Sequence, residues 1–172
     1  MSMNLRSSDV ATCLKLLFLS IYLAFCSNAS AALIDLPAEV RSKEFSLSRK
    51  ALALKGYDPV TYFKDGPRKG NHQITHVYRG IRYRFASESN RALFMQQPTQ
   101  YEPQYGGWCA WAMADKGGRT EANPESFKVI DGKLYVFYDG LFGDTLALWN
   151  KVGDDAGLID QANGYWARQV LK

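Results

Sequence analysis

Cysteine and histidine are scarce in this chain, with three cysteines and two histidines among 172 residues. Cys13 and Cys26 lie in an N-terminal segment with the features of a secretion signal, so Cys109 is the one cysteine expected in the mature protein. A single cysteine cannot form a disulfide within its own chain, which excludes the disulfide-stabilised scaffolds common among small exported domains. The fold must therefore be held by packing, for which 13% aromatic residues supply bulk.

The common catalytic signatures are also missing. The sequence contains no nucleophile elbow, phosphate-binding loop, dinucleotide-binding fingerprint or HExxH motif. General bases are few, because His72 and His76 lie four residues apart on one predicted strand and are interpreted as exposed side chains rather than a metal pair. The sequence thus indicates a site more firmly than a reaction.

A strong charge of one sign is absent as well. The chain carries 21 basic and 17 acidic residues, a net charge of +4. The basic residues are scattered, with 41–50 as their densest stretch, and no polybasic arm is present. Nucleic-acid binding is therefore not predicted, and the expected partner is a protein or small molecule that the sequence does not identify.

The N-terminal segment predicts export. Arg6 and Lys15 form a basic region, 16–25 is almost wholly apolar, and Ala29-Ser30-Ala31 is a small-residue cleavage site. The apolar run is short for a membrane span, which needs roughly 20 residues. We therefore expect residues 1–31 to be a signal peptide and the mature protein to be periplasmic or secreted, with no membrane span after cleavage. A retained anchor is the alternative.

The pattern of the remaining chain predicts one α+β domain. A polar lead-in at 32–50 precedes a single domain at 51–170. Turn signals and β-rich runs predict two antiparallel hairpins, joined at Arg79-Gly80 and Asp131-Gly132. Capping and periodicity predict about three helices. The expected strands are 51–54, 60–63, 74–78, 81–85, 127–130 and 134–137, and the expected helices are 88–97, 141–151 and 156–171.

Three motifs lie in the first half of the region expected to fold. They are GYDPVTYF at 56–63, YRFAS at 83–87 and PTQYEPQYGGWCA at 98–110. Together they resemble the exported YHS-domain family, over about 52–166. The resemblance implies a YHS-like α+β fold and a secreted or periplasmic accessory protein. Family members are mostly uncharacterised, and some relatives are selenoproteins with selenocysteine at the position of Cys109.

The resemblance also bears on metal binding. The broader YHS group, related to the TRASH metal-binding modules, includes domains in which cysteines follow an Asp-Pro-Val segment and flank a helix start. This chain has Thr61 after Asp-Pro-Val, and Ala86 and Asn90 around the predicted helix start. None of these side chains replaces a thiolate as a soft-metal ligand, so the family's metal site is expected to be absent here.

Three interpretations of Cys109 stay open. As a typical free cysteine it would be buried and inert. If a helix begins near Gly107, backbone amides of the first turn would favour a thiolate, and Cys109 would cycle through sulfenic acid or a mixed disulfide with a partner. Alternatively Cys109 and Met113, four residues apart, would hold copper as Cu(I), although a methionine at this spacing is more often core.

Five further residues are candidates for binding a small ligand. Tyr105, Trp108 and Trp111 surround Cys109 in the sequence, and Tyr57 and Asp58 belong to the first motif. Asp58 precedes a proline, so its first expected role is to form a turn. The sequence therefore predicts an exported accessory protein centred on Cys109, with a thiol redox role, a copper or ligand site, or a purely structural and interaction role as alternatives.

Overall fold

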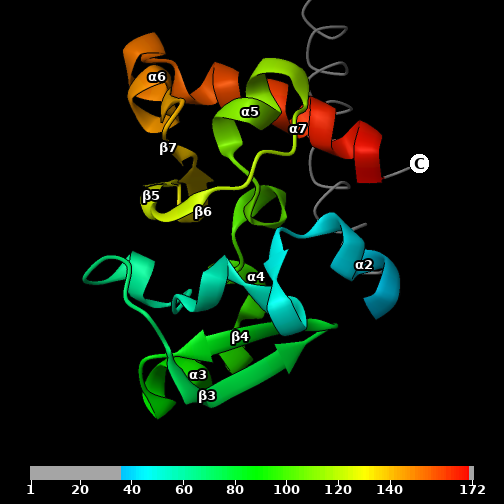
Figure 1. Cartoon of the computed structure of the whole chain (residues 1–172), viewed down its shortest axis with the longest axis vertical. Helices are drawn as coiled ribbons and strands as arrows, with labels where there is room; N and C mark the ends of the chain where they lie inside the picture. The colour runs from blue at the N-terminus through cyan, green and yellow to red at the C-terminus, as the bar shows by residue number, and fades with distance from the viewer. Residues whose placement is uncertain (1–35, 171–172) are drawn as a thin grey trace, which may run out of the picture.

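A four-stranded sheet forms one end of the structure, and three helices gather at the other (Figure 1). The computed structural model describes residues 36–170, and the predicted signal peptide at 1–31 lies outside them. The sheet has the strand order β1-β2-β4-β3, in which β2 and β4 are parallel and the other pairs antiparallel. Its strands are β1 (Leu47–Ser48), β2 (Leu52–Ala53), β3 (Asn71–Tyr78) and β4 (Ile81–Phe85).

The described residues contain six α-helices and two further strand pairs, so the predicted α+β class is confirmed. The helices are α2 (Ala38–Glu44), α3 (Glu88–Gln96), α4 (Pro98–Tyr101), α5 (Ala110–Lys116), α6 (Thr145–Val152) and α7 (Asp155–Val170). The strand pairs are β5 (Asn123–Ile130) with β6 (Lys133–Phe137), and β7 (Asp139–Gly140) with β8 (Gly143–Asp144). The short 3-10 turns are η1 (Arg49–Ala51), η2 (Leu54–Gly56), η3 (Thr61–Phe63) and η4 (Gln104–Gly107).

Both predicted hairpin turns lie where the sequence placed them. Arg79 and Gly80 join β3 to β4, and Asp131 and Gly132 join β5 to β6. All four residues have positive φ, as the tight turns that match strand twist require. A third, short pair, β7 with β8, was not predicted. It occupies 139–144, and residues 141–144 of it fall within the helix predicted at 141–151.

Two predicted strands are wrong or shorter than expected. The strand predicted at 60–63 is the 3-10 turn η3, because the Asp58 carboxylate accepts from the Val60 amide at 2.8 Å and Thr61 donates to the Asp58 carbonyl at 2.9 Å. These local bonds bend the chain before a strand can form. The strand predicted at 51–54 is reduced to β2.

Local capping explains where the helices begin. Ser87 caps α3 by accepting from the Asn90 amide at 3.2 Å, as its sequence position predicts. Asp144 caps α6 by accepting from the Ala147 amide at 3.0 Å, so that helix begins at Thr145 and not at 141. The segment after Cys109 is the helix α5. No helix among residues 36–170 is long and apolar enough to cross a membrane.

A buried ion pair ties α2, part of the predicted polar lead-in, to the core. Arg41 Nη2 lies 2.6 Å from each carboxylate oxygen of Glu102, and the Tyr83 hydroxyl donates to the same carboxylate at 2.5 Å. Burial, with the adjacent Glu102 charge, raises the pKa of Tyr83 well above its usual value. Helix α2 is therefore part of the folded domain.

Candidate functional site

Cys109 lies at the N-cap of α5, fully buried at 0% exposure. Its amide donates to the Thr120 carbonyl at 2.9 Å, and its carbonyl accepts from the Met113 amide at 3.0 Å. These bonds hold the residue between the chain that enters β5 and the first turn of α5. The helix α5 thus begins one residue after the cysteine and not near Gly107, and the thiol is buried.

The hydrogen bond of the Cys109 sulfur has a defined direction. Cys109 Sγ lies 3.3 Å from Thr145 Oγ1. The Thr145 hydroxyl donates a hydrogen bond to the Tyr138 carbonyl at 2.7 Å, and a hydroxyl has only one hydrogen to donate. Toward the sulfur the hydroxyl can therefore only accept, so the cysteine is the donor and carries its proton in this arrangement.

The β7–β8 hairpin closes directly beside this thiol. Thr145 donates twice to the Tyr138 carbonyl, from its amide at 2.9 Å and from its hydroxyl at 2.7 Å, which joins the two ends of the hairpin. At the tip, Leu141 and Phe142 are 92% and 90% exposed. Sequence reasoning missed this element, because Asp139-Gly140 is not its turn: these two residues pair with Gly143-Asp144 as strands, and Leu141-Phe142 forms the turn between them.

Met113 is a core residue in this structure. Its side chain is fully buried in the main cluster, and its sulfur accepts from Gln169 Nε2 at 3.9 Å. The same Gln169 amide donates to the Gly117 carbonyl at 2.7 Å, so α7 is fastened to the end of α5. Within residues 36–170 no three His, Cys, Asp or Glu side chains are grouped so that they could hold a metal ion.

The three aromatic candidates beside Cys109 are held by structural contacts. Tyr105 is buried, and its hydroxyl donates to Asn163 Oδ1 at 3.1 Å. Trp108 Nε1 donates to the Glu44 carbonyl at 2.7 Å, which fastens the end of α2 to this segment. Trp111 packs against the main core while remaining partly exposed. These side chains are placed around the cysteine by packing.

The two candidates from the first motif belong to other surroundings. Tyr57 lies in a smaller core cluster and donates to Glu125 at 2.5 Å, a hydrogen bond that raises the pKa of Tyr57. Asp58 is fully buried, and its carboxylate accepts from the Val60 amide, the Ala86 amide and the Asn90 side chain, the last two at 2.7 Å. It therefore joins the turn, the end of β4 and α3.

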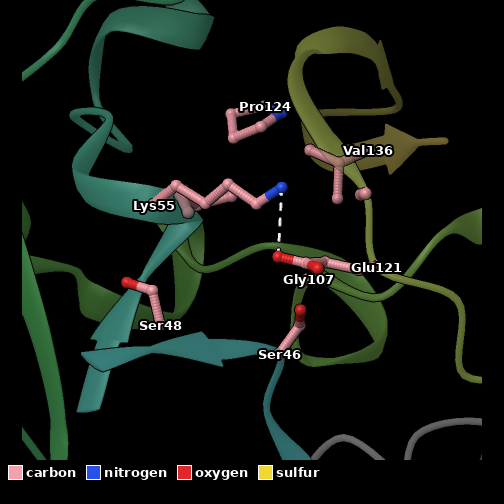
Figure 2. Close-up of a pocket in the computed structure, with 9 residues that line it drawn as sticks. Ser46, Ser48, Lys55, Gly107, Glu121, Pro124 and Val136 are labelled. Atoms are coloured by element: carbon pink, nitrogen blue, oxygen red, sulfur yellow. Dashed lines mark ion pairs between the residues drawn. The ribbon is translucent and has the colours of Figure 1, made fainter. Parts of the chain in front are cut away.

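A small pocket has Gly107 in its lining (Figure 2). It encloses about 280 Å³ of empty space, its open mouth included. Lys55 and Glu121 form a 3.1 Å ion pair across it, with Ser46 and Ser48 nearby. Sequence reasoning named none of these residues, since no motif sets them apart. The lining includes Gly107 but not Cys109.

Among known proteins, no family model, no curated protein and no solved structure matches this chain.

Proposed function

We propose that the protein is an exported accessory domain of YHS type that acts by binding a protein partner, with Cys109 as a structural thiol. One element supports this proposal, the β7–β8 hairpin. Its base lies against Cys109, whose thiol donates a hydrogen bond to Thr145. At its tip, the side chains of Leu141 and Phe142 are exposed. Of the roles predicted for the Cys109 region, an interaction role fits this arrangement best.

The buried thiol argues against redox exchange as the main activity. Attack on a disulfide needs a thiolate and access to the partner's sulfur. Cys109 has 0% exposure and donates a hydrogen bond, so both requirements would need the hairpin to open first. Copper binding would likewise need the Met113 sulfur to leave Gln169, and only two soft ligands would then be present.

The hairpin tip has the features of a protein contact. Two large apolar side chains at about 90% exposure are unusual on a domain whose other aromatic residues within 36–170 are buried or half-buried. Asp139 and Asp144 flank them and are both exposed. The chemistry favours an apolar pocket with a basic rim on the partner, and the aspartates disfavour an anionic lipid surface.

Thiol labelling of the native protein tests the first half of the proposal. Cys109 should react with a maleimide only as fast as the protein unfolds, while a cysteine placed at the exposed Ser89, in a Cys109→Ala background, should react at once. Fast labelling of Cys109 in the folded protein, or a sulfenic acid trapped there, would instead support the redox role.

Photo-crosslinking in the producing cell tests the second half. A photoreactive residue at position 142 should give a discrete protein adduct, and the same residue at the exposed position 133, at the start of β6, should not. The adduct should persist with Cys109→Ala, which removes the thiol. Adducts to lipid alone, or the same adducts from both positions, would contradict a protein contact at the tip.

A further inference from the structure

The chain segments that build the four-stranded sheet contain no acidic residue. Segments 45–57 and 66–87 supply all of β1 to β4, and neither has an aspartate or glutamate, although the whole chain has 17. Three basic residues lie in the first segment and five in the second. They are Arg49, Lys50, Lys55, Arg68, Lys69, Arg79, Arg82 and Arg84. The modest net charge of the chain conceals this separation.

The arginines of β4 project from the side of the sheet that faces away from the core. Ile81, Tyr83 and Phe85 are fully buried, so the alternate residues Arg82 and Arg84 point to the opposite face. In the strand register Val77 lies opposite Arg82 and Thr75 opposite Arg84 on β3, and Leu52 lies opposite Arg82 on β2. We call these five residues, Leu52, Thr75, Val77, Arg82 and Arg84, the outer sheet face, and Leu52 is the one of them that is buried.

Arg84 has no acidic partner on this face. Among residues 36–170, its Nε is buried without a hydrogen-bond partner, and none of the ion pairs involves Arg82 or Arg84. The other arginine with a buried, unbonded Nε is Arg41, whose terminal nitrogen binds Glu102. A partly buried cation without a counter-charge is unfavourable, and an anion supplied from outside would relieve it.

Two glycines allow the chain to pack closely against Arg84. A Cβ on Gly70 would lie 2.6 Å from the Arg84 carbonyl carbon and Cβ, and a Cβ on Gly56 would lie 3.3 Å from Arg84 Cδ and Nη1. The Gly70 amide donates to the Gly56 carbonyl at 2.9 Å, which joins the two glycines beside the arginine. The Arg84 side chain therefore packs against Gly56, and this contact restricts its freedom before any ligand arrives, so binding costs less side-chain entropy.

We propose that the outer sheet face binds an acidic segment of a protein partner, with Arg84 as the anchor. A carboxylate would accept from the Arg84 guanidinium, a second would pair with Arg82, and Val77, which is 48% exposed, would give an apolar contact. This surface is separate from the hairpin tip, so the inference goes beyond the proposed function and does not depend on it.

The composition of the face favours a protein over other polyanions. Single-stranded nucleic acid is bound on aromatic platforms, and the outer sheet face contains no aromatic residue. An anionic membrane is bound tightly where basic residues accompany apolar groups that insert, and the one strongly exposed apolar side chain here is Val77. Carboxylates on a flexible chain match two arginines on one strand, since each can be met separately.

Fluorescence anisotropy with a labelled ten-residue polyglutamate peptide tests the proposal on the purified protein. Arg84→Gln should weaken binding about tenfold and Arg82→Gln about threefold, as the loss of charge-assisted hydrogen bonds predicts. Lys151→Gln, at an exposed site on α6, removes the same charge and should leave binding within about twofold. Phe142→Ser should not change it, which separates this surface from the hairpin tip.

Several outcomes would overturn the proposal. They are the absence of peptide binding, an equal loss in all three charge variants, and tighter binding of a single-stranded oligonucleotide or of phosphatidylserine vesicles that depends on Arg84. Thermal melting confirms that each variant is folded. If Arg84→Gln fails to fold, the charge reversal Arg82→Glu tests the same face, and unchanged peptide binding in that variant would contradict it.

Discussion

The surroundings of Cys109 and the outer sheet face differ in how their polar groups are satisfied. Beside the cysteine each donor has an acceptor, since the thiol donates to Thr145 and the threonine to Tyr138. On the sheet, Arg84 packs closely against two glycines, and its buried Nε has no acceptor within residues 36–170. Cys109, the residue that the sequence singles out, thus has a hydrogen-bond partner within the fold. The group that lacks one is the guanidinium Nε of Arg84 on the sheet.

Breaking the most buried satisfied pair should have the largest effect. Glu102→Gln leaves the Arg41 guanidinium buried without a counter-charge, and we expect the free energy of unfolding to fall by about 3–5 kcal/mol. Urea denaturation measures it. The double variant Arg41→Met, Glu102→Gln should recover much of the loss, and a single-variant loss below about 1 kcal/mol would show that the pair is solvated.

A smaller loss is expected where the thiol meets the hairpin. Thr145→Val removes the acceptor of Cys109 and one donor to the Tyr138 carbonyl, which should cost about 1–2 kcal/mol. Maleimide labelling of Cys109 should become faster in the same variant, because unfolding or opening of the hairpin becomes easier. Thr145→Ser keeps the hydroxyl and serves as the control. Equal behaviour of the two variants would mean that the hydroxyl contributes nothing.

Loss of the Asp155 carboxylate should lower the stability less than either change above, and the loss should depend on pH. The Lys128 ammonium, helped by the Trp149 indole N–H, lowers the pKa of Asp155 in the fold. A carboxyl with a lowered folded pKa stabilises the protein above its unfolded pKa of about 4, and this stabilisation is lost as pH falls through the folded value. Asp155→Asn should therefore be less stable than the unaltered chain at pH 7, and the difference should narrow below about pH 4. A constant difference in melting temperature across this range would contradict the contact.

Removing the unsatisfied charge should have the smallest effect on stability. Arg84→Gln breaks no hydrogen bond or ion pair within residues 36–170, so its free energy of unfolding should change by no more than about 0.5 kcal/mol, or rise. Denaturation in urea, set beside Glu102→Gln, measures the contrast. A loss comparable to that of the buried pair would show that Arg84 stabilises the fold and would remove the distinction between the two regions.

Local signals predicted much of the fold. The turns at Arg79-Gly80 and Asp131-Gly132 and the Ser87 cap depend on neighbouring residues alone, and all three are found. The strand predicted at 60–63 failed because Asp58 bonds to groups two and three residues ahead, and its other acceptor oxygen is used by Ala86 and Asn90, which are distant in sequence. Such long-range hydrogen bonds do not alter the periodicity of apolar residues, so they cannot be recognised from the sequence pattern.

The candidate site was predicted less well, for a related reason. The position of Cys109 before a helix could be considered from Gly106 and Gly107, but its burial depends on Thr145, a residue 36 positions away. The outer sheet face could not be recognised from a run of basic residues, because its arginines alternate with apolar residues along β4. An absence of acids across 45–57 and 66–87 is visible in the sequence, yet it becomes meaningful only when the sheet brings both segments together.

The buried ion pair between Arg41 and Glu102 has a consequence for the order in which parts of the protein unfold. A seven-residue helix near the start of a domain would ordinarily fray. Here, separation of α2 from the domain would leave the Glu102 carboxylate buried without the Arg41 counter-charge, with the Tyr83 hydroxyl still donating to it. Amide protons of 38–44 should then exchange about as slowly as those of β4, and proteases that trim the chain from its N-terminal side should stop at α2 until the whole domain unfolds.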